Sequence, residues 1–210
     1  MILVYVYQLN IMKKKYEFSK ISTSDISIFL EESARIADHQ LSMIDDIMTI
    51  SEECVRVLNH GGKLLFCGNG GSASDSQHLA AELVNRFKKN RDPIPALALT
   101  TDTSVITSIG NDFGFKYIFS KQIEALANTT DLLFAISTSG LSENIIEALK
   151  TAKKKGMKTV LFTGKSAEPL NAYVDYFVNV PSDVTGVIQQ GHITIGQAIC
   201  MNIENSLEIN

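Results

Sequence analysis

The sequence contains little cysteine, with three residues among 210: Cys54, Cys67 and Cys200. Their number is odd, they lie far apart, and no two of them have the short spacing of metal ligands. These features exclude a disulfide framework and a cysteine-based metal motif. They indicate reduced thiols, as in a cytoplasmic protein.

Long apolar stretches are also missing. The chain has no run of about 18 or more apolar residues, the length that a membrane-spanning helix requires. The apolar start at residues 1–11 lacks both a basic region and a small-residue cleavage site, so it is not typical of a signal peptide. We therefore expect a cytoplasmic protein that has no membrane partner.

An excess of positive charge is absent as well. The net charge is −4 and the pI is about 5.6, so the chain as a whole offers no cationic surface to nucleic acid or anionic lipid. We accordingly expect no nucleic-acid partner. One local basic cluster is interpreted as a solvated helix end, where the helix dipole favours cations: Arg86, Lys88, Lys89 and Arg91.

The chain shows no internal repeat, low-complexity tract or linker, and its 210 residues suit one domain. We expect residues 1–23 to be an N-terminal tail and residues 24–210 to form a single domain. From Ser24 to Asn59, apolar residues recur in steps of three and four, which predicts one long helix or two consecutive helices. Gly61 and Gly62 end this helical segment.

Short apolar runs follow and alternate with helical stretches. The runs are continuous, which is typical of parallel strands buried on both faces, and they span residues 63–68, 94–99, 131–137, 158–164 and 175–180. Helical patterns cover residues 75–88, 102–110, 116–127, 142–155 and 187–204. This alternation predicts an α/β fold with a doubly wound parallel sheet. The last helix is apolar around much of its circumference, so we expect it to be buried between subunits of an oligomer.

Two of the expected strand ends carry the same chemistry, GNGGS at residues 68–72 and STSGLS at residues 137–142. Glycines let backbone N–H groups approach an anion, hydroxyls add donors, and the helix that follows contributes its positive end. A dinucleotide site would require an acidic residue at the end of the next strand, and a Walker loop would require Lys-Ser or Lys-Thr after the glycines. The chain has neither of these features, so both nucleotide interpretations are disfavoured. One such loop alone would favour a plain turn, but two at equivalent strand ends predict a phosphate monoester site.

Four motifs resemble the sugar isomerase (SIS) superfamily, and within it the isomerases of heptose phosphates. They are CGNGGSASDSQHLAAELVNRF, SIGNDFGF, ISTSGLSENI and IQQGHITIGQAIC, and they occur in the family's order. The resemblance covers about residues 24–205. It implies the SIS fold, a five-stranded parallel sheet flanked by helices with an N-terminal helical segment. It also implies a phosphosugar substrate, zinc, and a homotetramer with active sites at subunit interfaces.

The resemblance implies roles for particular residues. The substrate and its phosphate would be bound by Asn69, Gly70, Gly71, Ser72, Asn111, Asp112, Ser137, Thr138, Ser139, Ser142 and Gln189. The zinc positions of the family correspond to His78, Glu82, Gln189 and Gln197. Glu82 also corresponds to the catalytic carboxylate of the family.

His78 and Glu82 stand four residues apart, so they share one face of the helix behind the first loop. A carboxylate there can move a proton between C1 and C2 of an open-chain ketose phosphate, which makes an aldose without a redox cofactor. Imidazole and carboxylate can also ligate zinc. The plainer interpretation is a surface histidine hydrogen-bonded to Glu82, but the two phosphate loops favour the functional one.

The last helix departs from the family pattern. Gln197 stands where the family has a histidine that ligates zinc and transfers protons, Val187 where it often has arginine, and Gln190 where it often has glutamate. A glutamine ligates metals weakly and cannot transfer protons near neutral pH. Zinc binding should therefore be weakened, and we expect His192, a neighbouring protomer or a bound water to complete catalysis together with Gln197.

Two functions follow from these observations. The leading one is an aldose–ketose isomerase acting on a phosphosugar, sedoheptulose 7-phosphate in particular, for the heptose of lipopolysaccharide or capsule. The alternative is a catalytically impaired SIS-domain protein that binds a phosphosugar or docks to a partner, as the replication-initiator-associating proteins do. The phosphate loops, His78 and Glu82 favour the enzyme, whereas Gln197 and the missing arginine favour the alternative.

Overall fold

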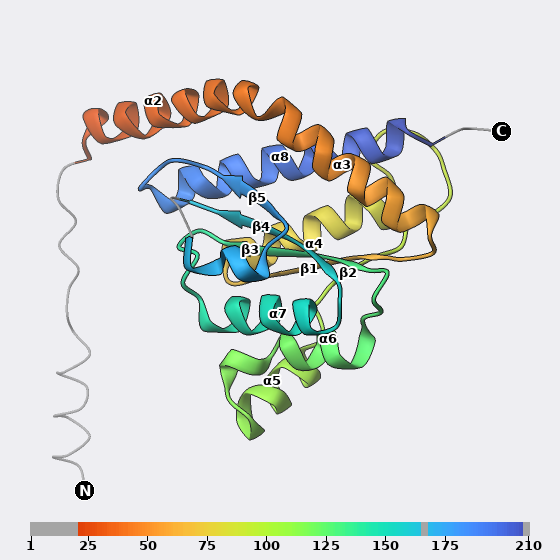
Figure 1. Cartoon of the computed structure of the whole chain (residues 1–210). Coiled ribbons are helices and arrows are strands. Elements are labelled where there is room, and N and C mark those ends of the chain that lie inside the picture. Colours follow the sequence, from red (N-terminus) through yellow and green to blue (C-terminus); the bar gives the residue numbers. More distant parts are fainter. Residues whose placement is uncertain (1–20, 165–167, 208–210) are drawn as a thin grey trace, which may run out of the picture.

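The computed structural model describes residues 21–164 and 168–207 (Figure 1). Residues 1–20 of the expected N-terminal tail lie outside the described residues. Five strands form one sheet: β1 (Leu64–Gly68), β2 (Ala96–Ala98), β3 (Leu132–Ser137), β4 (Lys158–Thr163) and β5 (Tyr176–Asn179). Their order is β2-β1-β3-β4-β5, and every neighbouring pair is parallel. The expected five-stranded parallel sheet is confirmed.

The continuous apolar runs are explained by burial on both faces of the sheet. Successive residues of a strand point to opposite faces. In β3, Phe134 and Ile136 belong to one core cluster, whereas Leu133 and Ala135 belong to the other. An alternating apolar and polar pattern would have left one face in water, so this sheet required covering on both sides.

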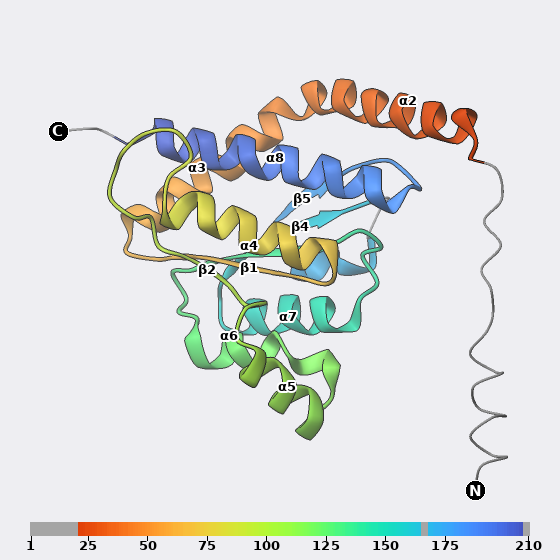
Figure 2. The same cartoon turned by 180° about the vertical axis from the view of Figure 1, so that it is seen from behind.

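Helices supply this covering on both faces (Figure 1, Figure 2). One face carries α3 (Ile44–Asn59), α4 (Gly71–Val84) and α8 (Thr185–Asn205). The other carries α5 (Thr103–Asp112), α6 (Ser120–Leu126) and α7 (Glu143–Lys154), with the short 3₁₀ helices η2 (Phe115–Tyr117) and η3 (Glu168–Tyr173) in the connections. The doubly wound arrangement is therefore confirmed.

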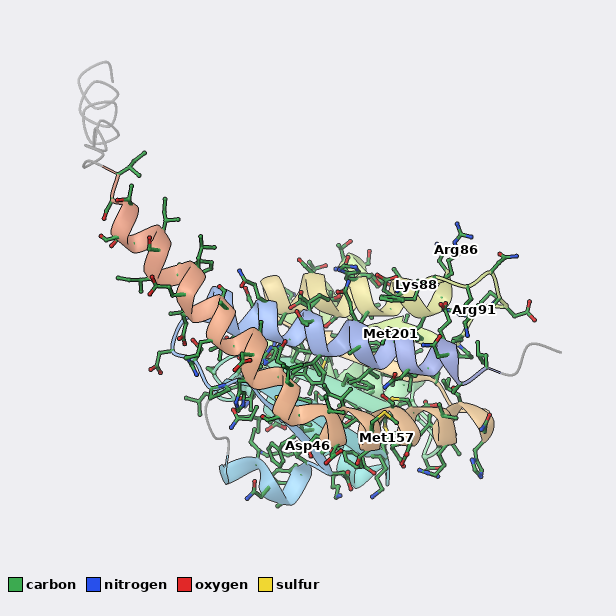
Figure 3. All side chains as sticks on the ribbon, turned by 90° about the horizontal axis from the view of Figure 1, so that it is seen from above. Asp46, Arg86, Lys88, Arg91, Met157 and Met201 are labelled. Carbon is green, nitrogen blue, oxygen red and sulfur yellow. The ribbon has the colours of Figure 1, made fainter. Side chains whose placement is uncertain are left out.

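The helical segment at residues 24–59 consists of two helices, α2 (Thr23–His39) and α3, joined by the 3₁₀ turn η1 (Gln40–Met43). The side chain of Gln40 is buried, and its Nε2 donates a hydrogen bond of 2.9 Å to the carbonyl of Gly191 in α8. This contact holds the turn against the body of the chain. Beyond it, α2 projects away from the sheet (Figure 3).

Helix α4 begins at Gly71, four residues earlier than its apolar pattern predicts, and ends at Val84 rather than near residue 88. Glycines and serines do not continue an amphipathic period, which is why the sequence did not reveal its first turn. These small residues let α4 start directly against β1. A Cβ atom on Gly68 would lie 2.5 Å from the carbonyl oxygen of Ser72, so the first loop and the first turn of α4 are one packed unit.

Helix α8 is buried within the chain, which corrects the expectation that its apolar surface is buried between subunits. It lies between α4 and the α2–α3 segment (Figure 3). Ile195, Ile199 and Ile203 are each at most 2% exposed. The apolar circumference of α8 thus reflects a central place in one helical layer. Among the described residues, no helix combines the length and apolarity needed to cross a bilayer.

Candidate active site

The two expected phosphate loops meet at the topological switch point of the sheet. The chain places β2 on one side of β1 and β3 on the other, so the connections that follow β1 and β3 leave the sheet in opposite directions. Such a switch point opens a crevice beyond the carboxyl ends of the strands, where α/β proteins bind ligands. Residues 68–72 follow β1 and residues 137–142 follow β3, so both loops border this crevice.

The first loop turns sharply and packs against α8. Gly70 has a φ of 55°, a conformation that favours glycine, and the carbonyl of Asn69 accepts a hydrogen bond of 3.0 Å from the N–H of Ser72. Gly71 lies so close to α8 that an added Cβ would be 2.5 Å from Nε2 of Gln189. The structure thus brings Gln189 to the first loop, although 118 residues separate it from Gly71.

The second loop keeps hydroxyl groups available for an anion. Ser139 Oγ accepts a hydrogen bond of 3.1 Å from the N–H of Leu141, which leaves its O–H free to donate. Ser137 Oγ donates to Ser142 Oγ at 3.2 Å, so the O–H of Ser142 is likewise available. The carbonyl of Thr138 accepts from the N–H of Gly164 at 3.0 Å, which anchors the loop to the end of β4.

A reciprocal amide pair joins the two loops. Asn69 Nδ2 donates to Asn144 Oδ1 at 2.9 Å, and Asn144 Nδ2 donates to Asn69 Oδ1 at 2.8 Å. Asn69 follows β1, whereas Asn144 lies in the first turn of α7 and is 2% exposed. The pair therefore fixes the separation of the loops. It occupies the side chain of Asn69, which the sequence had suggested as a direct substrate ligand.

His78 and Glu82 form a pair on α4, as their spacing predicts. His78 Nε2 lies 3.0 Å from Glu82 Oε1, and the two side chains are 50% and 19% exposed. A pair this exposed contributes only about 0–1 kcal/mol to folding. Its position matters more than its stability, because α4 starts in the first loop and carries Glu82 in its last turn.

Asp75 belongs to the same face of α4 and was not recognised in the sequence. It precedes His78 by three residues and Glu82 by seven, a helical spacing that the sequence does contain. Burial raises the pKa of its carboxyl to about 6, although the nearby His78 acts to lower it. Its Oδ2 is buried and has no hydrogen-bond partner among the described residues. A second acidic group therefore lies on this face of α4, between the first loop and the His78–Glu82 pair.

The polar residues of α8 are divided between crevice and core. Gln189 and Gln197 are half-buried and lie eight residues apart on one continuous helix, a separation of about 12 Å along its axis. Of the two other departures from the family pattern, Val187 is buried in the core and Gln190 is exposed. Gln189 approaches the first loop, and Gln197 follows two turns later beside α4.

His192 lies inside the core and not with the candidate site residues. It is 0% exposed, its ring packs against Phe162, and Nε2–H donates a hydrogen bond of 3.0 Å to the carbonyl of Thr163. Burial lowers its pKa to about 4, against the opposing effect of that hydrogen bond. A neutral, enclosed imidazole cannot exchange protons with a substrate in the crevice. This location differs from the expectation that His192 takes part in catalysis, and we leave it out of the site.

Asn111 and Asp112 are also apart from the loops. They end α5, on the opposite face of the sheet from α4 (Figure 1), and both are exposed. Asn111 Nδ2 donates to Asp112 Oδ1 at 2.8 Å. The described part of one chain therefore does not bring this pair to the crevice.

The donor set does not make a zinc site within one chain. No group of three or more histidine, cysteine, aspartate or glutamate side chains converges anywhere in the described ranges. His78 and Glu82 supply two ligands of the kinds that zinc prefers, and Gln189 and Gln197 add only amides. The residues present thus do not fit a complete zinc site.

Comparisons with known proteins agree with this arrangement. A family model described as the SIS domain matches residues 29–164. The phosphoheptose isomerase of Maridesulfovibrio salexigens is 51% identical over 161 residues, which is 77% of this chain and 78% of the relative. The solved phosphoheptose isomerase of Neisseria gonorrhoeae has a TM-score of 0.81 and 39% identity, covering 87% of this chain and 98% of its own.

A second solved phosphoheptose isomerase, from Francisella tularensis, has a TM-score of 0.85 and 37% identity, covering 89% of this chain and 100% of its own. The likeness therefore extends over almost the whole of both solved chains, in fold as well as in sequence. The chain belongs to the SIS domain family, and within that family to the phosphoheptose isomerases.

Proposed function

We propose that the chain interconverts sedoheptulose 7-phosphate and a heptose 7-phosphate, an aldose, for the biosynthesis of cell-surface heptose. One observation carries this proposal. The two hydroxyl and glycine loops are joined by the Asn69–Asn144 pair at the switch point, and the helix that starts in the first loop carries Glu82. In this proposal the loops bind the phosphate and Glu82 acts as the general base. The names of the relatives support the same function.

In the mechanism that this geometry supports, the second loop binds the phosphate through the O–H groups of Ser139 and Ser142. Glu82 removes a proton from C1 of the open-chain ketose, so that the C1–H bond becomes the C1=C2 bond of an enediol and O2 is protonated. Glu82 then returns the proton to C2 as the carbonyl forms at C1. His78 orients the carboxylate by donating its Nε2–H.

Gln197 would stabilise charge on the sugar oxygens by donating hydrogen bonds from its amide. It cannot carry the proton that moves between O1 and O2. With His192 enclosed in the core, a bound water or a group from a neighbouring protomer would transfer this proton. The alternative function, a catalytically impaired binding protein, is not favoured, because the matched relatives are named as isomerases.

A homotetramer with active sites at subunit interfaces is part of the proposal. Two observations support it. The projecting helix α2 exposes Ile26, Ile28 and Leu30, each more than half exposed, and monomeric proteins rarely leave such a surface in water. Asn111 and Asp112 are expected to contact substrate and yet lie away from the crevice of their own chain, so a neighbouring copy would supply them. Light scattering that finds a stable monomer at micromolar concentration would contradict this part of the proposal.

We further propose that residues 24–210 act as a single SIS domain and that the protein works in the cytoplasm. The three cysteines support this location, since Cys54, Cys67 and Cys200 are buried and unbridged. Burial raises the pKa of the Cys67 thiol above its usual range, which keeps that thiol protonated and unreactive.

The decisive experiment for the function uses the purified chain and a panel of ketose phosphates with five to seven carbons. NMR in deuterated water would follow exchange of the C1 protons and formation of the aldose. We expect turnover to be fastest with sedoheptulose 7-phosphate. Binding of the phosphosugars without exchange or turnover would support the binding protein instead.

Replacing Ser139 by alanine should weaken phosphosugar binding by about 1–3 kcal/mol, the scale of a hydrogen bond to a charged group. Calorimetry in a Glu82→Gln background would measure this affinity without turnover. Ser33→Ala on α2 is the control, because it removes a hydroxyl that donates to the carbonyl of Phe29 within the same helix. Equal affinities in the two variants would remove Ser139 from the phosphate site.

Zinc enters the proposal only as a weakly bound ion, because Gln197 replaces an imidazole. Gln197→His should raise zinc affinity on the order of 10- to 100-fold, as measured by competition with a chelating dye. Gln190→His places the same imidazole on an exposed position of α8 and serves as the control. The assignment of position 197 to the metal shell fails if both variants bind zinc equally well.

A further inference from the structure

The cluster of basic residues after α4 contains a buried ion pair and is not simply a solvated helix end. Arg86 and Lys88 are exposed, but the side chain of Arg91 is 4% exposed and that of Glu204 is 2% exposed. Arg91 Nε lies 3.0 Å from Glu204 Oε2. Figure 3 shows Arg86, Lys88 and Arg91 gathered at the same end of the helical layer.

The Glu204 carboxylate, near the end of α8, is surrounded by donors. In addition to the ion pair with Arg91, it accepts hydrogen bonds from the backbone N–H groups of Phe87 at 2.9 Å, Lys88 at 2.7 Å and Lys89 at 2.7 Å. Burial would raise its pKa, but these hydrogen bonds outweigh burial and lower the pKa to about 2. The connection after α4 is thereby fastened to the end of α8, and Figure 2 shows it curving past that end.

The other donors of Arg91 turn back to the last turn of α4. Nη2 donates to the carbonyl of Glu82 at 2.8 Å, and Nη1 donates to the carbonyl of Leu83 at 2.7 Å. Nη1 also donates a longer hydrogen bond of 3.4 Å to the carbonyl of Asn85, and one of 3.0 Å to the carbonyl of Asp92, the next residue in the chain. The final carbonyls of a helix have no partner within the helix, so Arg91 caps α4 at the residue that carries the proposed catalytic carboxylate.

We propose that Arg91, held by Glu204, is a positioning residue that fixes the last turn of α4 and with it the Glu82 carboxylate relative to α8. The inference rests on the proposed function. Its physical reason is the fork of the guanidinium, which satisfies carbonyls of α4 and the Glu204 carboxylate at the same time. A lysine has the same charge but presents a single ammonium group, so it cannot span both.

The experiment that tests this positioning role compares substitutions of two buried carboxylates. Glu204→Gln and Asp131→Asn each remove one charge from a carboxylate that accepts backbone N–H groups and pairs with a cation. Asp131 pairs with Lys63 at 2.6 Å and accepts hydrogen bonds from the backbone N–H groups of Lys63 and Asn128, which lie before β1 and β3 and not in α4. Both variants should lower the melting temperature.

Only Glu204→Gln and Arg91→Lys should lower kcat, on the order of 10- to 100-fold, with KM changed less than about threefold, because the base is displaced while the phosphate loops are intact. The proposal would be overturned if Glu204→Gln and Arg91→Lys kept the kcat of the wild type while their melting temperatures fell as much as that of Asp131→Asn.

Hydrogen exchange provides a readout that does not depend on turnover. Amides in the last turn of α4 should exchange faster in Arg91→Lys than in Asp131→Asn, relative to the wild type. If the wild type fails to isomerise any ketose phosphate, the proposed function fails, and the exchange rates still decide the positioning role. Unchanged exchange in that turn would overturn it.

Discussion

Glu82→Gln should lower kcat by about 10³-fold or more while leaving phosphosugar affinity within a few-fold of the wild type. General bases contribute on the order of 10²–10⁴-fold to catalysis, and an amide of the same shape cannot accept the C1 proton. The loops that bind the phosphate are not altered by the change. The measurement pairs NMR exchange of the C1 protons with calorimetry of the ketose phosphate.

The control for this prediction is Glu147→Gln, which removes a glutamate from α7 whose carboxylate pairs with Lys150 at the surface. Its turnover should equal that of the wild type. Folding should be nearly unaffected in both variants, because His78 and Lys150, the cations that pair with the two glutamates, are 50% and 43% exposed and such pairs contribute little to stability. Near-normal C1 exchange in Glu82→Gln would show that the base lies elsewhere, with Asp75 as the next group to test.

Gly68→Ala should disrupt the site and destabilise the fold together. The new Cβ would lie 2.5 Å from the carbonyl oxygen and 2.7 Å from the carbonyl carbon of Ser72. These are backbone atoms, so no rotation of a side chain relieves the clash, and the first turn of α4 must shift. We expect a loss of about 3 kcal/mol in the free energy of unfolding and a fall in kcat of at least about 100-fold.

Denaturant unfolding and steady-state kinetics check this prediction, with Gly110→Ala as the control. A Cβ at Gly110 in α5 would have Ile118 Cγ2 as its nearest neighbour, at an ordinary 3.9 Å. That substitution should leave stability unchanged or raise it by up to about 1 kcal/mol, because alanine is the better helix former. A Gly68→Ala variant as stable as Gly110→Ala would show that the start of α4 moves freely.

The fold was largely predictable, because its strongest signals are local. Continuous apolar runs such as residues 131–137 reflect burial on two faces, and β3 lies within that range. The start of α4 was not predictable from periodicity, since its first turn consists of Gly71 and small side chains. Burial of α8 was predicted correctly, but whether it is covered by its own chain or by another depends on tertiary packing.

The candidate site likewise has local features that the sequence shows and distant partners that it does not. The loops and the spacing of His78 and Glu82 are local patterns, and Asp75 could have been found from the same spacing. The partners that hold these elements in place come from distant segments. Asn144 is 75 residues from Asn69, and Glu204 is 113 residues from Arg91. A single sequence carries no signal that pairs such residues.

The amide pair between the loops also bears on the chemical ageing of the protein. Asn69 precedes Gly70, and asparagine before glycine loses its amide most readily, because the unhindered glycine nitrogen attacks the side-chain carbonyl carbon to form a succinimide. In this structure that side chain is held by two hydrogen bonds to Asn144, so the attack requires both to break first. Asn144 therefore protects the first loop from deamidation, which would otherwise leave a carboxylate among the donors that an anionic substrate needs.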